Sequence, residues 1–387
     1  MLLSIIKDGG LMVDPRDTRL ADLLVHYSIG LKKDENVYLQ TDSVDALPLF
    51  LEVYKKIIQG GGNPFPHILL DPHASYEAMD YTFMKHTSEK QLKQLSELKL
   101  KEMQAMHAYI RIGGPANKYD LAGIDQKRIA LRKRTTKPIL DERLRKKWAV
   151  TRYPTSSMAQ AANMSTEDFA TFFYNACLTD WSKQEKIQEK LTRILEKGKV
   201  MRILGEDTDL HIGIEGRKFE KCIAKCQFNP DLGRYEGANI PDGEIYTGPV
   251  ENFTHGYIKY TYPYTEGGKK IEGISLTFEH GKIIKYYAEK NQEALEALLG
   301  TDAGAKRLGE AAIGTNPKIT RFMDETLFDE KILGTVHITP GNSYEGHGFN
   351  KSAIHADIVK DLRPKFGGGE IQIDGEVIQK NGKWTFA

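Results

Sequence analysis

The sequence predicts two domains, an α/β amino-terminal domain with a largely parallel sheet and a mixed α+β carboxy-terminal domain. The chain has 387 residues, which is more than one typical hydrophobic core supports. Helical and strand-like patterns alternate along the first half, as in parallel sheets covered by helices. Short β-like runs dominate from about residue 199, so we expect the domains to span residues 1–190 and 191–387.

The amino-terminal elements follow from hydrophobic spacing and from helix-stop residues. Leu20, Leu23 and Leu24 recur at helical intervals. The glycines at 60–62 end a second helix, because glycine is preferred just past a helix end. Short apolar runs between such segments are predicted strands. The predicted elements are a helix over 20–29, a strand over 36–40, a helix over 45–59 and strands over 66–71 and 108–112.

An amphipathic helix is predicted where the two domains meet. Ser182 and Glu185 form a capping box, and Ile187 and Leu191 belong to one apolar stripe. Gly198 ends this helix. Beyond it we predict strands over 200–204, 210–214, 274–278 and 282–287 and a helix over 291–299.

The charge balance gives no case for a general nucleic-acid binder or a polybasic membrane-binding protein. Lys and Arg together number 54, and Asp and Glu number 53. Residues 127–147 contain ten basic and two acidic residues, but no aromatic side chains on which bases would stack. We therefore interpret this segment as the solvated face of a helix, and we predict no nucleic-acid partner.

The predicted compartment is the cytoplasm. Three cysteines are too few for a disulfide framework in a chain of this length. The apolar run at the amino terminus stops at Lys7, which is too short for a signal peptide. No stretch reaches the 18 or so apolar residues of a membrane span, so we expect a soluble protein without a membrane partner.

Several common catalytic motifs are missing from the sequence. Neither glycine-rich nucleotide fingerprint is present, and neither is H-E-x-x-H. The segment 341–346 resembles a serine nucleophile elbow but is one residue too long. Cys222 and Cys226 have no second pair and no suitably spaced histidine, so we interpret them as small buried residues.

Histidines and acids are concentrated in the last third of the chain, inside apolar or glycine-rich segments. Glu310 stands among small apolar residues, and a buried carboxylate needs a partner. Taken alone, each such residue also has a non-catalytic interpretation, as a solvated acid, a structural histidine or, for Tyr344, a packing side chain. The candidates are Glu244, Glu310, Glu330, His337, Tyr344, His355 and Asp357.

Of these patterns, the pair His355 and Asp357 gives the most specific indication of metal binding. On a strand, residues two apart point to the same face, whereas Ala356 would point away. An imidazole and a carboxylate on one face suit zinc, manganese or cobalt. Together with the other candidates they form a set large enough for two divalent ions, a common device for hydrolysis.

These segments resemble the thermophilic aminopeptidase family of dimetal metallo-aminopeptidases. The matching strings are NIPDGEIYTGP at 239–249, RLGE at 307–310, LFDEKILGTVHI at 327–338 and NKSAIHADIV at 350–359. Order and approximate spacing match from about residue 237 to the end. The amino-terminal half matches more loosely, through YSIGL at 27–31 and residues 148–155.

The resemblance implies an aminopeptidase that hydrolyses short peptides with water activated by two divalent ions, zinc, cobalt or manganese. It implies the ligands Glu244, Glu310, His337, His355 and Asp357 in a carboxy-terminal catalytic domain, and Tyr344 as the catalytic tyrosine. Glu330 is the candidate for a further ligand, seven residues before His337. Glu310 is our choice for a bridging ligand, and either Glu310 or Glu330 handles the proton. The resemblance also implies a homodimer.

Two alternatives remain open at this stage. Another dimetal hydrolase, an amidase or a phosphoesterase, would share the metals but not the substrate. A non-catalytic binding protein of the same fold would lack the ions, but it would then bury several unpaired charges.

Overall fold

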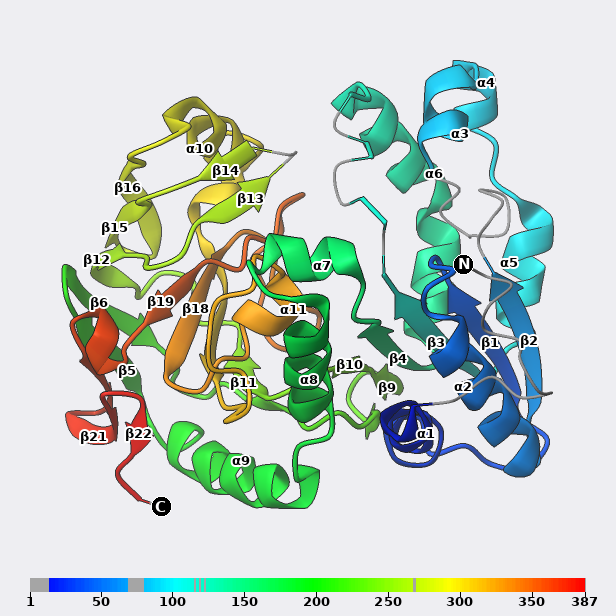
Figure 1. Ribbon diagram of the computed structural model, residues 1–387. Helices are drawn as coiled ribbons and strands as arrows, with labels where there is room; N and C mark the ends of the chain where they lie inside the picture. Colours follow the sequence, from blue (N-terminus) through cyan, green and yellow to red (C-terminus); the bar gives the residue numbers. More distant parts are fainter. Residues whose placement is uncertain are drawn as a thin grey trace. The chain divides into compact units, whose positions relative to one another are not determined.

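The computed structural model describes residues 14–68, 80–114, 116, 117, 120, 121, 123–266 and 269–386. Residues 1–13, on which the signal-peptide expectation depends, lie outside these ranges. The chain forms two compact units (Figure 1). The first comprises Met1–Leu178 and Ala224–Pro241, and the second comprises Thr179–Ile223 and Asp242–Ala387. The boundary predicted between residues 190 and 191 lies inside α9 (Trp181–Leu195).

The first unit is built on a five-stranded parallel sheet, as predicted. Its strand order is β10-β4-β3-β1-β2, and every neighbouring pair is parallel. Residues 69–71 of the predicted strand 66–71 lie outside the described ranges. The strands are β1 (Asn36–Thr41), β2 (Asn63–Ile68), β3 (Ala108–Gly113), β4 (Lys147–Arg152) and β10 (Ala238–Ile240).

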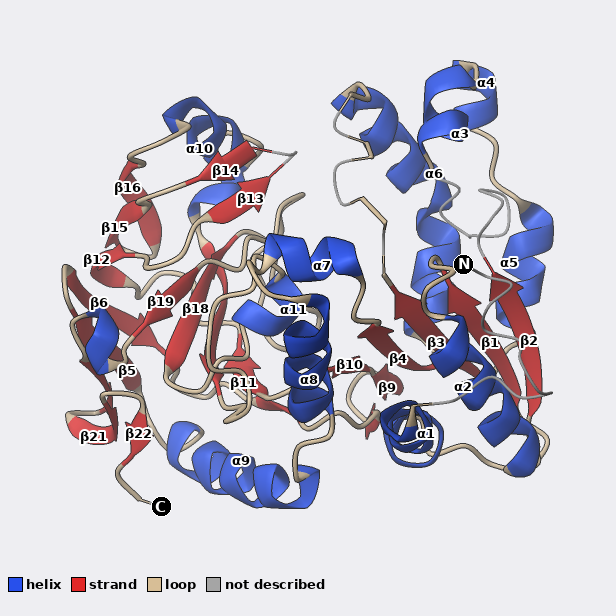
Figure 2. Ribbon diagram, viewed as in Figure 1, coloured by secondary structure: helices blue, strands red, loops and turns tan. Residues whose placement is uncertain are grey.

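Helices cover this sheet, with α2 on one face and α5 and α6 on the other (Figure 2). Several begin at a side chain that caps the first turn, such as Asp14, Thr155 and Ser165. The predicted helix over 20–29 is the end of α1 followed by a π-helical turn, η2 (Leu23–Ser28). The α-helices are α1 (Pro15–Asp22), α2 (Leu47–Gln59), α3 (Tyr81–His86), α4 (Glu89–Leu92), α5 (Glu97–Gln104), α6 (Gln126–Leu144), α7 (Ser156–Ala161) and α8 (Thr166–Cys177).

The basic segment 127–147 forms most of α6 and the first residue of β4. Two of its arginines bind backbone carbonyl groups. Arg128 donates to the carbonyl groups of Met84 and Thr87. Arg132, which is buried, donates to the carbonyl group of Gln94. These arginines therefore tie α6 to neighbouring segments, in addition to the solvated role that the sequence predicts.

The second unit contains two antiparallel sheets, in agreement with the predicted mixed class. The larger has the order β16-β15-β12-β6-β5-β20-β21-β22, and the smaller β19-β18-β17-β11-β7. The larger contains β5 (Val200–Gly205), β6 (Thr208–Gly213), β12 (His255–Lys259), β15 (Ser275–Glu279), β16 (Lys282–Tyr287), β20 (Gly369–Ile373), β21 (Glu376–Lys380) and β22 (Lys383–Trp384). The smaller contains β7 (Glu220–Cys222), β11 (Glu244–Thr247), β17 (Leu308–Gly314), β18 (Thr335–Pro340) and β19 (Val359–Asp361).

One apolar core joins both sheets of the second unit with α9 and α10 (Gln292–Leu299). Every residue of β17 and β18 is buried. Polar side chains on these two strands therefore lie inside the unit, where they need partners. The unit also contains α11 (Thr326–Asp329), the short helices η4 (Ala303–Lys306) and η5 (Pro364–Phe366), and the hairpin of β13 (Tyr264–Glu266) and β14 (Lys269–Ile271). A further hairpin, β8 (Gln227–Asn229) and β9 (Arg234–Glu236), belongs to the first unit.

The capping box predicted at Ser182 is wrong. The N-cap of α9 is Asp180, two residues before Ser182. Its side chain accepts a hydrogen bond from the backbone N–H of Lys183. Aspartate and serine cap helices about equally well, so the local pattern alone does not choose between them. Among the described residues, no helix combines the length and the apolar character that crossing a membrane requires.

Candidate metal centre

The predicted candidates gather on one face of the smaller sheet in the second unit. Glu244 opens β11, Glu310 lies in β17 and His337 lies in β18, which are neighbouring strands. The register places Glu244 opposite Gly314, and Glu310 opposite Thr339, two residues after His337. Because side chains alternate along a strand, Glu244, Glu310 and His337 point to the same side.

His355 and Asp357 complete this face from an extended segment before β19. The sequence predicts a strand here, but the segment is not a regular strand. His355 forms only an isolated bridge with Gly341. The alternation still applies, since His355 Nε2 lies 3.2 Å from Asp357 Oδ1 while Ala356 is buried on the other side. Glu330 reaches the cluster differently, as the capping residue directly after the last residue of α11.

One half of the cluster is formed by Glu310, His355 and Asp357 around His337. His337 Nε2 lies 2.9 Å from Glu310 Oε1, and His355 Nε2 lies 3.8 Å from Glu310 Oε2. Thr339 donates a hydrogen bond of 2.8 Å to Asp357 Oδ1. Glu310, His337 and Asp357 offer ligand atoms within 4.8 Å of one another, a spacing that suits a divalent ion.

The other half is formed by Glu244 and Glu330, again beside His337. His337 Nε2 lies 3.2 Å from Glu244 Oε2, and these three residues make a second group of possible ligands. The side chain of Lys331 is completely buried here. Its Nζ lies 3.1 Å from Glu244 Oε1 and also contacts Glu330 Oε1. This half of the cluster thus already contains a cation.

Both imidazoles have the orientation that metal-binding histidines adopt. Nδ1 of His337 lies 3.1 Å from the carbonyl oxygen of Glu330, and Nδ1 of His355 lies 2.8 Å from that of Asn342. Such contacts hold the ring and place the proton on Nδ1, which leaves Nε2 as the ligand atom. In both residues Nε2 points toward the carboxylates.

The donor set fits divalent ions. Glu244 Oε2 and Glu310 Oε2 are buried and accept no hydrogen bond from the described residues, although imidazole nitrogens lie 3.2 and 3.8 Å away. A buried carboxylate oxygen without a hydrogen bond is unfavourable unless a cation compensates it. Carboxylates and imidazoles together are typical ligands of zinc, cobalt and manganese.

The electrostatics of the cluster reflect burial and opposite charges acting together. Burial acts to raise the pKa of Glu244, but Lys331 and His337 outweigh it and lower the pKa to about 2. Burial acts to lower the pKa of His355, but Asp357 and Glu310 raise it to about 10. For Glu330, burial prevails over Lys331 and raises the pKa to about 8.

Tyr344 lies in the glycine-rich loop beside the cluster. Its ring centroid is 4.8 Å from that of His355 and 5.6 Å from that of Tyr246. The residue is 49% exposed, so it is open to solvent while it touches a candidate ligand. His347 of the same loop packs against Tyr246. The tyrosine that the resemblance implies therefore does lie at the cluster.

Several residues of the cluster were missed. Lys331 was overlooked because a lysine next to a glutamate usually indicates solvent-exposed surface. Cys222 lies opposite Glu244 in the β7–β11 register and forms a third group of possible ligands with Glu244 and Asp242. Cys222 and Cys226 were predicted to be small buried residues, whereas both are half-buried. Strand register, which the sequence does not display, is what brings Cys222 opposite Glu244.

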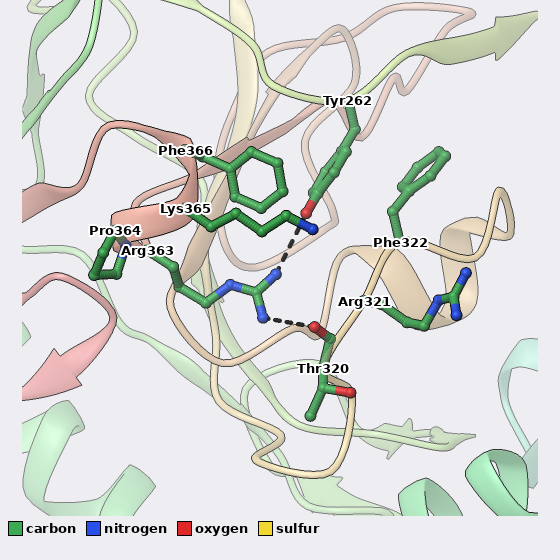
Figure 3. Close-up of a pocket in the computed structure, with 8 residues that line it drawn as sticks. All are labelled: Tyr262, Thr320, Arg321, Phe322, Arg363, Pro364, Lys365 and Phe366. Carbon is green, nitrogen blue, oxygen red and sulfur yellow. Dashed lines mark hydrogen bonds between the residues drawn. The ribbon is translucent and has the colours of Figure 1, made fainter.

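A cavity of about 610 Å³ lies elsewhere in the second unit (Figure 3). None of the predicted candidates lines it. The Tyr262 ring stacks on Phe322, and Arg363 donates to the Thr320 carbonyl group and to Tyr262. The lining residues are Tyr262, Thr320, Arg321, Phe322, Arg363, Pro364, Lys365 and Phe366.

Comparison with known proteins agrees with the resemblance noted in the sequence. Aminopeptidase 2 of Geobacillus stearothermophilus is 24% identical over 95% of this chain and 97% of its own length. Aminopeptidase T of Thermus thermophilus is 31% identical over 47% of this chain and 48% of its own. The structure of wild-type AmpT from Thermus thermophilus has the same fold, with a TM-score of 0.78 at 21% identity over 96% of this chain and 99% of that one. The family described as thermophilic metalloprotease (M29) matches residues 14–384, and the chain therefore belongs to that family.

Proposed function

We propose that this chain is a metal-dependent aminopeptidase that removes the amino-terminal residue from short peptides. The observation that carries the proposal is the largely buried cluster of four carboxylates and two imidazoles, whose Nε2 atoms both point toward carboxylates. Membership of a metalloprotease family and the relatives named aminopeptidases support the same activity.

The residues that would hold divalent ions are those on the shared face of the smaller sheet. Glu310, His355 and Asp357 form one set, Glu244 and Glu330 form the other, and His337 lies between them. The resemblance implies two such ions, and an ion bound at either set would lower the pKa of water toward neutrality and polarise the peptide carbonyl group. We propose zinc, cobalt or manganese, which all suit these ligands.

The chain's own side chains contribute orientation and proton transfer. Thr339 holds Asp357 through a hydrogen bond, and the carbonyl groups of Glu330 and Asn342 hold the two imidazoles. Glu310 or Glu330 accepts the proton that the attacking water loses, since both are buried within the cluster. The Tyr344 hydroxyl donates a hydrogen bond to the carbonyl oxygen as negative charge develops on it.

The setting of the enzyme is part of the proposal. We propose a cytoplasmic location, supported by the three cysteines, all within the described residues and none in a disulfide. We also propose a homodimer, as the family resemblance implies, and light scattering of the purified chain tests this.

The decisive experiment measures hydrolysis by the metal-free protein after it is reloaded with zinc, cobalt or manganese in turn. Amino-acid anilides with a free amine are the substrates, N-acetylated anilides are the matched control, and phosphate esters test phosphoesterase activity. We expect the free anilides alone to be hydrolysed, and only by metal-loaded protein. Cleavage of acetylated anilides, cleavage of phosphate esters or activity without metal would contradict the proposal.

A further inference from the structure

We propose that the Lys331 ammonium group takes the place of a second divalent ion beside Glu244 and Glu330. The chain would then bind one divalent ion tightly, at the Glu310 half of the cluster. This inference rests on the proposed function only insofar as that function requires an ion at the cluster.

The position of Lys331 is the first support. No part of its side chain is exposed, and its Nζ contacts one oxygen of Glu244 and one of Glu330. These two glutamates are two of the three members of one group of possible ligands. An ion there would have to bind the remaining oxygens of these glutamates, directly beside an ammonium group that occupies Oε1 of each.

The backbone at Lys331 is held on both sides, so the side chain starts from a fixed point next to the cluster. The N–H of Lys331 donates to the Phe328 carbonyl group at 3.0 Å, and its carbonyl group accepts from Asn316 at 3.0 Å. Lys331 also directly follows Glu330 in the chain, so the two side chains start from neighbouring Cα atoms. From this fixed Cα, the fully buried side chain places its ammonium group between Glu244 and Glu330.

His337 supplies the second argument, because it has one nitrogen for two groups of ligands. Its Nδ1 faces the Glu330 carbonyl group, so only Nε2 is directed at the carboxylates. Nε2 lies 2.9 Å from Glu310 and 3.2 Å from Glu244. One lone pair binds one ion, and an ion in the Glu310 half also has His355 and Asp357. The Glu244 half would then keep two carboxylates that already face a positive charge.

Repulsion between the Lys331 ammonium group and a divalent ion should weaken ion binding beside Glu244 and Glu330. A divalent ion next to a buried ammonium group is repelled more strongly than it would be in water, because the local dielectric constant is low. Removing the ammonium charge should therefore open the second half to an ion. The expected change is in the number of ions bound.

The test is a metal titration of the full-length, metal-free chain, using buffered Zn²⁺ as the probe and mass spectrometry to count bound ions. We expect wild type to retain one ion per chain where Lys331→Met retains two. The dissociation constant of the second ion should be about 100-fold higher in wild type, the upper end of what a single neighbouring group does at metal sites. Saturating zinc should also raise the unfolding temperature more in Lys331→Met.

Three further variants guard against misinterpretation. Lys331→Arg keeps the charge and should still bind one ion, and Lys331→Gln replaces Lys331→Met if the latter does not fold. Lys147→Met removes a buried lysine that pairs with Glu35 in the first unit, and it should leave the count at one. Two equally tight ions in wild type would overturn this inference alone. No bound ion in wild type or Lys331→Met would overturn the proposed function together with it.

Discussion

The acids of the candidate metal-binding cluster in the second unit have cationic neighbours, whereas the buried Asp17 of the first unit is hydrogen-bonded to a neutral hydroxyl group. In the second unit, the three glutamates and one aspartate of the cluster lie beside Lys331, His337 and His355. In the first unit, Asp17 is fully buried in α1, and its Oδ1 accepts a hydrogen bond of 2.6 Å from the Tyr174 hydroxyl. Asp17 Oδ2 accepts no hydrogen bond from the described residues.

The difference shows what burial alone does to an acid. Burial, opposed by the Tyr174 hydrogen bond, raises the pKa of Asp17 to about 6. Burial acts in the same direction on Glu244, but Lys331 and His337 reverse it and the pKa falls to about 2. Glu244 therefore stays charged because Lys331 and His337 accompany it, whereas for Glu330 the effect of burial prevails over Lys331. Removing one negative charge should therefore damage the second unit and stabilise the first.

The largest expected effect is that of Glu310→Gln. The substitution keeps the shape of the side chain and removes a charge that a bound cation requires. We expect kcat/KM to fall at least ~1000-fold, because several kcal/mol of metal-dependent stabilisation would be lost. Anilide hydrolysis and metal content measure the change. Glu293→Gln, which alters an exposed glutamate of α10, is the control and should remain within twofold. Near wild-type turnover with full metal content would exclude Glu310 as a ligand.

A smaller loss of activity is expected for Tyr344→Phe. This variant tests a second difference between the units, in the surroundings of a tyrosine hydroxyl. Tyr174 is buried with its hydroxyl committed to Asp17, whereas Tyr344 is 49% exposed beside His355. Phenylalanine keeps the ring contact and removes only the hydroxyl. We expect kcat to fall about 100-fold, the size of losing one donor to a developing oxyanion. Steady-state kinetics of anilide hydrolysis measure the change.

The KM and the metal content of Tyr344→Phe should stay unchanged, since the hydroxyl acts on the transition state. Tyr287→Phe, in an exposed tyrosine of β16, is the matched control. A kcat within twofold of wild type would remove Tyr344 from the proposed mechanism.

Much of the cluster was predictable because its residues lie in short, locally regular segments. Strand alternation correctly places His355 and Asp357 together, and the resemblance selected Glu244, Glu310 and His337, which the sheet brings side by side. Their roles as ligands stay predictions. The parallel sheet of the first unit was also predictable, because its strands and helices alternate in the sequence.

The features that were missed depend on contacts between distant segments. The strand β10 returns to the first unit and pairs with β4, about ninety residues earlier in the chain, and no local pattern reveals this. Lys331, which follows α11, is buried with its ammonium group on Glu244 of β11, so a residue type that is usually exposed becomes interior. Local patterns predict elements and faces, whereas register and packing decide which charges meet.

The smallest expected effect is on stability, in the variant Asp17→Asn. The raised pKa means that folded Asp17 binds its proton more tightly than the unfolded chain does between about pH 3.8 and 6. Stability therefore falls as the pH rises through this window and stays low above it. Asparagine keeps an oxygen for Tyr174 and removes the charge. We expect a gain of about 1–2 kcal/mol at pH 7.5 and almost none at pH 4.

Urea unfolding followed by circular dichroism across this pH range measures the difference between Asp17→Asn and wild type. Asp168→Asn is the matched control, because Asp168 also lies in the first turn of a helix of the first unit but is exposed. It should lose a few tenths of a kcal/mol, since an acid near a helix N-terminus is favourable. A loss of stability in Asp17→Asn at pH 7.5 would show that the buried charge is compensated after all. The statement that the first unit holds an uncompensated buried acid would then be wrong. The predictions for Glu310 and Tyr344 would not be affected, because they depend on separate measurements.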